Sequence, residues 1–299
     1  MSGTLAVVRY SLVELSRRRI LIVFFAVGAA GIVLIATLLK VFTTALTGNV
    51  SFQSSGSSLD PATLDHALEL GFVSDIISVL GLFALLIAFG IGMTVIYHDL
   101  ESGAAISIFS KPVSRVAFTA GKVAAAIVAM IVIVGVLGIE ARLVMVLFGT
   151  GDLGPALWWE TVAQVANAIT LMLLVMALST WMNNIIAAVV AFIYNAVAGV
   201  VVALHAQALA GGLGNNAVLK TGLDVLYWVV PHALISDAPR EIAKAEFALV
   251  AAASRGGPTA DQFLSSVPSA SGATDILWWA FGIAVFALLV YSAVRRRQV

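Results

Sequence analysis

Cysteine is missing from the 299-residue chain, and charged residues are few. Without thiols the chain forms no disulfide bonds and performs no thiolate chemistry, and its cysteine content leaves the redox compartment open. Only 11% of the residues are charged and 61% are hydrophobic, whereas a soluble domain is about 25% charged. With a mean hydropathy of +1.05 and no net charge, the composition indicates a protein of the lipid bilayer and gives no sign of nucleic acid binding.

Catalytic and nucleotide-binding motifs are missing too. The stretch FTAGKVA departs from the phosphate-binding loop G-x-x-x-x-G-K-[ST], because Val116 stands at the first glycine and Val123 at the final hydroxyl residue. The four histidines are scattered and form no H-E-x-x-H motif, and no G-x-S-x-G motif occurs. We therefore expect no ATP site, no metal or cofactor site and no enzyme active site in this chain.

Six apolar stretches are long enough to cross a bilayer, for which a helix needs about 20 residues. Alternation of the β-barrel type does not occur in them. The sequence thus predicts an all-α integral membrane protein with a single domain over residues 1–299. The predicted spans are 20–39, 76–97, 123–139 with a continuation past Arg142, 161–182, 185–204 and 276–294.

Ten of the 16 basic residues lie beside three of these spans. With six spans, all ten fall on one side of the membrane, and the positive-inside rule places that side in the cytoplasm. We therefore expect both termini to be cytoplasmic. The ten residues are Arg9, Arg17, Arg18, Arg19, Lys111, Arg115, Lys122, Arg295, Arg296 and Arg297.

The segment 4–19, ahead of the first span, predicts an amphipathic helix in which Glu14 and Arg18 form a favourable i,i+4 pair. Such a helix is expected to lie along the inner membrane surface. The alternative is a frayed cytoplasmic tail. The apolar face of the helix would carry Leu5, Val8, Leu12 and Leu15.

Two segments are expected on the outer side. In the first, which connects the first and second spans, Asp60 before Pro61 predicts the start of a helix. The second, 206–275, contains the apolar stretch 221–236, which Asp224 and a proline at 231 interrupt. We interpret this stretch as an interfacial or re-entrant helix. The alternative is a seventh span, which would place the C-terminal arginines outside.

The loop 98–122, between the second and third spans, carries acidic residues at its start and basic residues toward its end, and the stretches on either side of it are uncharged. Ser114 can cap the third span, and Lys122 can extend to the inner headgroups. Two interpretations stay open: a short amphipathic helix that docks a cytoplasmic partner, or a basic loop that only anchors the membrane. The residues that suggest docking are the acidic Asp99 and Glu101, the bend at Gly103, the apolar Ile106, Ile108 and Phe109, the helix-stopping Pro112, and Arg115.

Three elements of this loop resemble the signature of ABC-2 type transporter permeases. Asp99, Glu101 and Gly103 match its acidic–glycine turn, Pro112, Val113, Ser114 and Arg115 match its proline–arginine part, and Gly121 and Lys122 match its G-K pair. The chain departs from the pattern at Asp99, where Glu is usual, and at Ala104, where Thr is usual. The segment 4–19 resembles the family's elbow helix. In overall shape the chain is similar to the permeases of nitrous-oxide-reductase maturation and gliding-motility systems.

The resemblance implies a bacterial inner-membrane permease that works with a separate ATPase docked on the loop 98–122. Two permeases, expected as a homodimer, and two ATPases form such a unit, and ATP and Mg²⁺ bind only to the ATPases. ATP hydrolysis would then drive substrate export or transmit a conformational change across the membrane. The outer segment 206–275 could contact a periplasmic or extracellular partner.

Three amide side chains lie inside predicted spans. Gln164 and Asn167 share a helical face, and Asn195 lies 11 residues beyond Asn184, about 16 Å along the helix. Polar groups at this depth are costly. They are candidates for a translocation path or for interhelical hydrogen bonds that hold the bundle together.

Two other functions stay open. The first is a non-transporting transmitter or assembly factor that acts on an outer partner through the segment 206–275. The second is an ion-coupled secondary transporter, which would need paired acidic residues in the middle of the membrane. The predicted spans after Lys122 hold only Glu140, near one end of its span.

Overall fold

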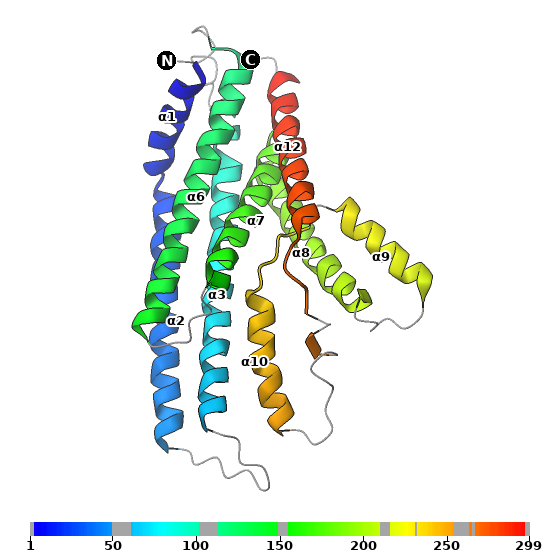
Figure 1. The fold of residues 1–299 in the computed structure, drawn as a ribbon. Helices are drawn as coiled ribbons and strands as arrows, with labels where there is room; N and C mark the ends of the chain where they lie inside the picture. Colours follow the sequence, from blue (N-terminus) through cyan, green and yellow to red (C-terminus); the bar gives the residue numbers. More distant parts are fainter. Residues whose placement is uncertain are drawn as a thin grey trace.

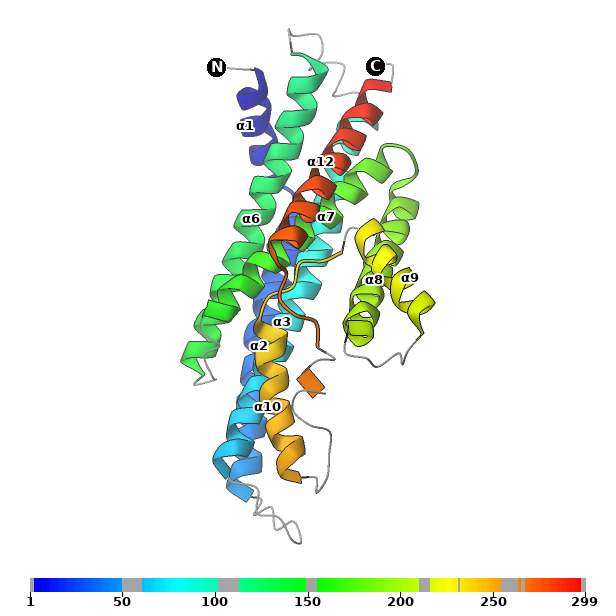
Figure 2. The same ribbon diagram turned by 45° about the vertical axis from the view of Figure 1, so that its right-hand side comes forward.

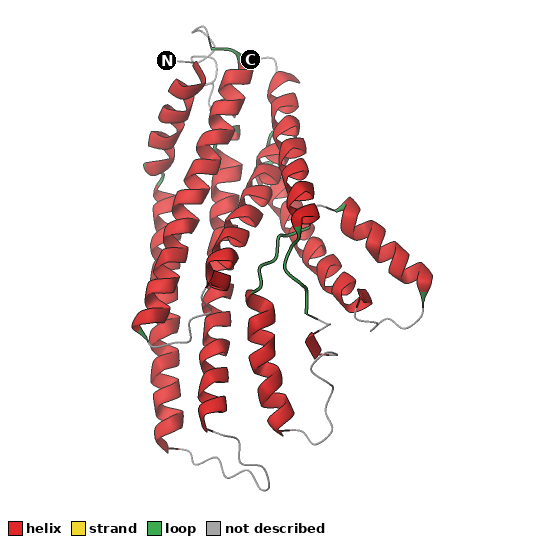
Figure 3. Cartoon of the chain, viewed as in Figure 1, coloured by secondary structure: helices red, strands yellow, loops and turns green. Residues whose placement is uncertain are grey.

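The computed structural model of the chain describes residues 3–49, 61–101, 113–148, 155–209, 216–230, 232–253, 263–264 and 267–296. Within these ranges the regular structure is helical throughout and no strand occurs (Figure 3). The predicted all-α fold is confirmed. The principal helices are α1 (Gly3–Ser16), α2 (Arg19–Asn49), α3 (Pro61–Thr94), α4 (Tyr97–Glu101), α6 (Arg115–Leu147), α7 (Pro155–Ser179), α8 (Asn184–Leu209), α9 (Ala217–Val229), α10 (Ala238–Ala253) and α12 (Ala273–Arg296).

Six segments of the described chain are long and apolar enough to cross a membrane, and each coincides with a predicted span. They are Arg19–Leu38, Leu70–Glu101, Arg115–Leu147, Leu157–Ser179, Asn184–Leu209 and Ala273–Arg296. The third continues past Arg142 as predicted but begins earlier, because α6 starts at Arg115. The chain is a multi-pass α-helical membrane protein, and its two ends lie at the same end of the bundle (Figure 1).

Local capping chemistry begins two of the helices where the sequence predicts. α3 starts at Pro61, whose missing N–H costs nothing at the first helical position. Ser114 caps α6, because its side-chain oxygen accepts a hydrogen bond from the backbone N–H of Ala117 at 3.1 Å. The third span therefore begins at a defined point, directly after the loop that holds the charges.

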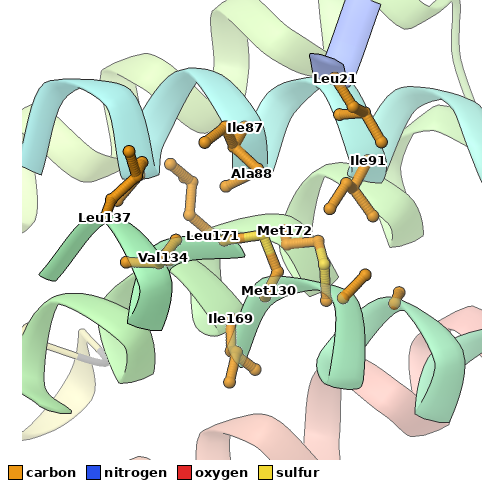
Figure 4. Close-up of a cluster of buried hydrophobic side chains, with 14 of the residues drawn as sticks. Leu21, Ile87, Ala88, Ile91, Met130, Val134, Leu137, Ile169, Leu171 and Met172 are labelled. Carbon is orange, nitrogen blue, oxygen red and sulfur yellow. The ribbon is translucent and has the colours of Figure 1, made fainter. Parts of the chain in front are cut away.

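The core of the bundle lies where α3, α6 and α7 meet (Figure 4). Ile87 and Ile91 of α3, Met130 of α6 and Met172 of α7 are fully buried there. α7 is the most enclosed of the six spans. It contacts α3, α6, α8, α10 and α12, which are most of the other helices of the bundle.

Glycines let α7 approach its neighbours closely. A Cβ at Gly92 of α3 would lie 2.8 Å from the carbonyl oxygen of Met172, and one at Gly138 of α6 would overlap the side chain of Thr161. Lipid tails are as apolar as side chains, so helix association in a bilayer depends on such close packing. The contacts of α7 with α3 and α6 depend on the missing side chains.

Three helices are longer than a bilayer requires. α2 has 31 residues, α3 has 34 and α6 has 33, about 45–50 Å at 1.5 Å per residue, whereas the hydrocarbon core is about 30 Å thick. Of these, α2 and α3 project at the end opposite the termini, where α10 packs against α3 (Figures 1 and 2). Residues 39–49 of α2 and 61–69 of α3 lie beyond the segments that are apolar enough to cross a membrane.

α1 forms as predicted but contacts a different surface. It runs alongside the first turns of α6, nearly in line with α2, rather than across the end of the bundle (Figures 1 and 2). Its buried residues are Val7, Ser11 and Leu15, whereas Leu5 is 50% exposed, so only part of the predicted apolar face is packed. The reason lies in α6: a Cβ at Gly121 would be 2.8 Å from the Val7 side chain, so only glycine permits this approach.

The predicted helix over 221–236 is wrong in its second half. α9 ends at Val229, two residues before the proline at 231, as expected where proline disfavours helical backbone in the preceding residue. Residues 232–237, which we name the strap, are non-helical and lead into α10. α9 lies beside α8 and leaves Val218 and Val229 exposed. The part of the outer segment that enters the bundle is therefore the strap.

Candidate functional site

Two groups of predicted site residues can be compared with the structure. In the first group, Asp99 and Glu101 lie on α4 and Arg115 begins α6. The remaining predicted docking residues, Gly103, Ile106, Ile108, Phe109 and Pro112, lie outside the described residues. The helices that flank the predicted docking segment are therefore the parts whose geometry is known.

A buried ion cluster joins three helices at the end where the termini lie. The ammonium of Lys122 on α6 lies 2.6 Å from a carboxylate oxygen of Asp99 on α4 and 3.0 Å from one of Glu14 on α1. The Lys122 side chain has no exposed surface, and that of Asp99 is 3% exposed. The expectation that Lys122 extends to the headgroups is wrong, because two carboxylates hold its charge inside the protein.

Glu14 links the cluster to the basic residues before the first span. It also forms an ion pair with Arg18, one turn further along the chain. Burial raises the pKa of Glu14, but hydrogen bonds from Arg18 and Lys122 outweigh burial, so the pKa lies below its ordinary value. The ring of Tyr10 lies 5.5 Å from the Lys122 ammonium, close enough for a cation–π contact. At neutral pH Glu14 is therefore ionised beside the two basic side chains.

The other two described docking residues are closer to the surface. Glu101 is exposed and accepts a hydrogen bond from the Tyr97 hydroxyl at 2.9 Å. Arg115 donates to the backbone carbonyl of Arg295 at 2.9 Å, which ties the start of α6 to the end of α12. The last span is therefore tied to α6 directly beside the predicted docking segment.

The second group of predicted residues meets in one groove. Gln164 and Asn167 of α7 and Asn195 of α8 line a groove of about 260 Å³ between α3, α7 and α8. Gly81 of α3 forms the facing wall, where a Cβ would lie 3.1 Å from the Gln164 side-chain oxygen. The strap closes part of the groove with Ala233. The sequence thus identified residues that lie together, although it could not show which element faces them.

The strap is held by polar side chains of α7. The Asn167 amide donates to the carbonyl oxygen of Leu234 at 2.9 Å and accepts from its N–H at 2.8 Å. Glu160, a buried carboxylate that the sequence reasoning missed, accepts from the Ser236 hydroxyl at 2.6 Å and from Gln164 at 2.7 Å. Asn167 therefore pairs with irregular backbone rather than with another helix, which replaces the predicted interhelical contact.

A second set of contacts fastens the strap to α9 and α12. The Tyr227 ring is stacked between His205 and His232, with centroids 4.2 and 3.8 Å away. The Tyr227 hydroxyl donates to Asp275 at 3.2 Å, and a His232 ring nitrogen lies 3.2 Å from the same oxygen. Burial and the Asp275 carboxylate raise the pKa of Tyr227. No local signal in the sequence could have paired these residues, because they come from four separate segments.

His232 has an acceptor at each ring nitrogen. One nitrogen lies 3.2 Å from Asp275 and the other 2.9 Å from the carbonyl oxygen of Tyr227. A neutral imidazole donates from only one nitrogen, whereas the protonated ring donates from both. The two ring nitrogens therefore connect His232 both to α12 and to the end of α9.

The polar side chains of these sites join separate helices and the strap through hydrogen bonds and ion pairs. Among the described residues, no group of three or more His, Asp or Glu side chains could hold a metal ion. No known family model matches the chain, and no curated protein is found to be similar to it. The fold and the two polar clusters define a polytopic α-helical membrane protein with a buried ion cluster near its termini and an amide-lined groove within its bundle.

Proposed function

We propose that the chain is the membrane-spanning subunit of an ABC transporter of the ABC-2 type, driven by a separate ATPase. The observation that carries the proposal is the buried cluster of Glu14, Asp99 and Lys122, which fastens α1 and the two helices flanking the segment 102–112. The resemblance of this segment and its neighbours to an ATPase-docking region supports the same function. A subunit that is driven by a docked ATPase needs rigid helices around the docking segment, so that movement of the segment moves those helices.

The cluster suggests how force enters the bundle. A push on residues between α4 and α6 reaches both helices and α1 together, since Lys122 is bonded to carboxylates on the other two. α6 contacts α7 closely at Gly138, and α7 holds the strap through Asn167. Packed helices shift as units rather than deform continuously. Motion that starts near the termini would therefore arrive at the groove.

The proposed assembly contains two copies of this chain, as a homodimer, and two ATPases that bind ATP and Mg²⁺. The chain lies in a bacterial inner membrane with both termini and the segment 98–122 in the cytoplasm. This orientation places Arg9 of α1, Arg115 and Lys122 of α6, and the last arginines of α12 on the cytoplasmic side, in line with the positive-inside rule. The ATPase has to contribute all nucleotide chemistry.

The test begins with the reading frames beside this chain, one of which should encode an ATPase, and continues with reconstitution of the two proteins. The isolated chain should hydrolyse no ATP, and the ATPase should co-purify with it. Phe109→Ala should weaken that association more than Arg115→Ala, because apolar anchors carry more binding energy than rim charges. Steady ATP turnover by the isolated chain, or equal association of both variants with the ATPase, contradicts the proposal.

A non-transporting transmitter is the second candidate, favoured by the projecting ends of α2 and α3 and the packing of α10 on α3. Gly81→Leu separates the two candidates because it fills the groove, whereas Gly135→Leu points into open space. A transporter should lose its substrate-dependent ATP hydrolysis with Gly81→Leu only. A transmitter should keep its nucleotide-driven motion at α10 with either variant.

A further inference from the structure

One short segment borders four separate cavities. Residues of the strap line the groove between α3, α7 and α8 and a cavity of about 20 Å³ next to it. They also line a cleft of about 210 Å³ beside α8 and α9, which we name the outer cleft, and a cleft of about 320 Å³ beside α7 and α12. The strap is therefore a partition between the spaces of the bundle.

The groove and the outer cleft approach each other on either side of His232. The small cavity shares Asn167, Asn195 and Ala233 with the groove and reaches His232. Tyr227, which is stacked on His232, lines the outer cleft. The residues between the two spaces are thus the first part of the strap and the ring stacked on it.

The groove lining combines amides with apolar walls. Gln164, Asn167 and Asn195 supply donors and acceptors, and the remaining lining residues are Gly81, Leu82, Ala84, Leu85, Ala168, Leu171 and Ala233. None of these side chains carries a charge. Such a surface can satisfy a neutral molecule with several hydrogen-bonding groups, but it offers no counter-charge to an ion.

Asn195 points to an occupant of this kind. Its side chain is exposed although it lies near the middle of α8, and it makes no hydrogen bond within the described chain. An amide that faces hydrocarbon without a partner is costly, because it loses its hydrogen bonds to water and gains none in return. Water or a polar ligand in the groove removes that cost, whereas lipid does not.

We propose that this groove is a binding site for a neutral molecule rich in hydrogen-bonding groups, and that the strap is the gate between the groove and the outer cleft. This inference names the class of substrate and the barrier that the substrate crosses. Its interpretation as transport rests on the proposed function. A 260 Å³ space suits a small polar solute or the headgroup of an amphiphile.

A few hydrogen bonds and one His–Asp contact hold the gate in place. Asn167 and Glu160 hold it to α7, and Ser271 exchanges hydrogen bonds with Ile235 at 2.9 Å in each direction. His232 and Asp275 hold its beginning to α12. These contacts come from α7 on one side and from α12 and the residues leading into it on the other, so a shift of α7 relative to α12 would strain both sides of the strap.

The first test asks whether water fills the groove. The chain has no cysteine, so Asn195→Cys and its control Val197→Cys, two residues along and 48% exposed, each introduce a single thiol. In lipid nanodiscs, a methanethiosulfonate reagent should label Asn195→Cys about tenfold faster or more, because thiols in apolar surroundings stay protonated. Equal, slow labelling of both overturns the inference.

The second test releases the gate. In intact cells, an impermeant reagent outside should label Asn195→Cys slowly, and adding Asn167→Ala should accelerate labelling about tenfold, since it removes both bonds to Leu234. Gln164→Ala is the matched control, because this amide bonds Glu160 rather than the strap. Unfolding temperatures verify that each variant folds. No acceleration by Asn167→Ala, or the same acceleration by Gln164→Ala, means that the strap is not the barrier.

The third test addresses the ligand class with two probes of similar size. Glucose at high concentration should slow the labelling of Asn195→Cys in nanodiscs, and glucose 6-phosphate should not, because the groove holds no positive charge. Protection by the phosphate sugar, or by neither sugar, overturns the ligand class. None of these measurements uses an ATPase. If no ATPase associates with the chain but the labelling results are as expected, the proposed function is rejected and the binding site and gate are retained.

Discussion

At the scale of single residues, Lys122 is the most unusual group in the chain. It is a fully buried cation, and its charge is matched by carboxylates that come from two other helices. Burying ions costs several kcal/mol each, so such a cluster contributes little net stability by itself. It does impose a strong penalty on any arrangement that separates the three helices, because one ion would be left without its partner.

Removal of this cation should be destabilising. Lys122→Met leaves Asp99 buried without its partner and should lower the free energy of unfolding by about 3–5 kcal/mol. Lys244→Met is the matched control, since Lys244 pairs with Glu241 with both side chains nearly half exposed, and its effect should stay below about 1 kcal/mol. Denaturant titration in detergent measures both. Adding Asp99→Asn to Lys122→Met should recover part of the loss, and further loss would contradict the buried pair.

Glu14 makes the attachment of α1 dependent on pH. Its folded-state pKa is depressed below the ordinary 4.5, so its contribution is present above the unfolded pKa and is lost as pH falls through the folded pKa. Amide hydrogen exchange in α1, corrected for intrinsic rates, should be constant at neutral pH and rise below about pH 4.5. Glu14→Gln should remove this step. A step of the same size in the variant would assign it to another group.

At the scale of helices and connections, local chemistry could be predicted from the sequence and long-range pairing could not. Pro61 and Ser114 begin α3 and α6 as expected, because a cap depends on residues within one turn. The strap was expected to be helical, since its apolar sequence contains nothing that indicates Asn167 as its partner. Its backbone is satisfied by side chains 67 residues away, a pairing visible only in three dimensions.

The same contrast holds for the helix faces. Periodicity predicted an apolar face of α1 that includes Leu5, which is exposed. The face that packs contains Ser11 and Val7, because Gly121 on α6 permits their approach. A hydrophobic pattern gives the face that avoids water, but inside a bilayer close packing decides which face meets a neighbour.

Glycine at the contact between α3 and α7 should resist substitution. Gly92→Ala places a methyl group 2.8 Å from a backbone oxygen of α7, which cannot turn away, and should destabilise the protein by about 1–3 kcal/mol. Gly135→Ala on α6 is the matched control, because nothing lies within 4 Å of its Cβ position, and it should be neutral or stabilising by up to about 1 kcal/mol. Thermal unfolding of the two proteins gives the comparison. Equal stability would show that α3 and α7 are not in close contact.

At the scale of the whole molecule, six spans could be predicted because each depends only on length and apolarity. The convergence of Gln164, Asn167 and Asn195 on one groove was foreseeable only in part. The first two share a helical face by spacing, whereas the position of Asn195 depends on how α8 rotates against α3 and α7. Helix rotation is decided by the packing of several helices together, which no single segment encodes.

The proposed orientation predicts which end of the bundle reagents reach. Thr44, on the projecting end of α2, is exposed, and so is Ser16, at the end of α1. In intact cells an impermeant thiol reagent should label Thr44→Cys, and it should label Ser16→Cys only after permeabilisation, because Ser16 adjoins the basic residues that the positive-inside rule places in the cytoplasm. The reverse pattern would invert the topology.

The junction of the strap and α10 has a consequence for anything that touches the far end of the protein. The Ser236 hydroxyl that donates to Glu160 also accepts from the N–H of Ala238, the first residue of α10. Moving the strap therefore reorients α10 on α3. If a receptor or antibody binds α10 more tightly in one strap position, linkage requires that its binding shift the strap toward that position by the ratio of the two affinities. A molecule bound at the far end would thus report, and in turn restrain, the position of the strap inside the bundle.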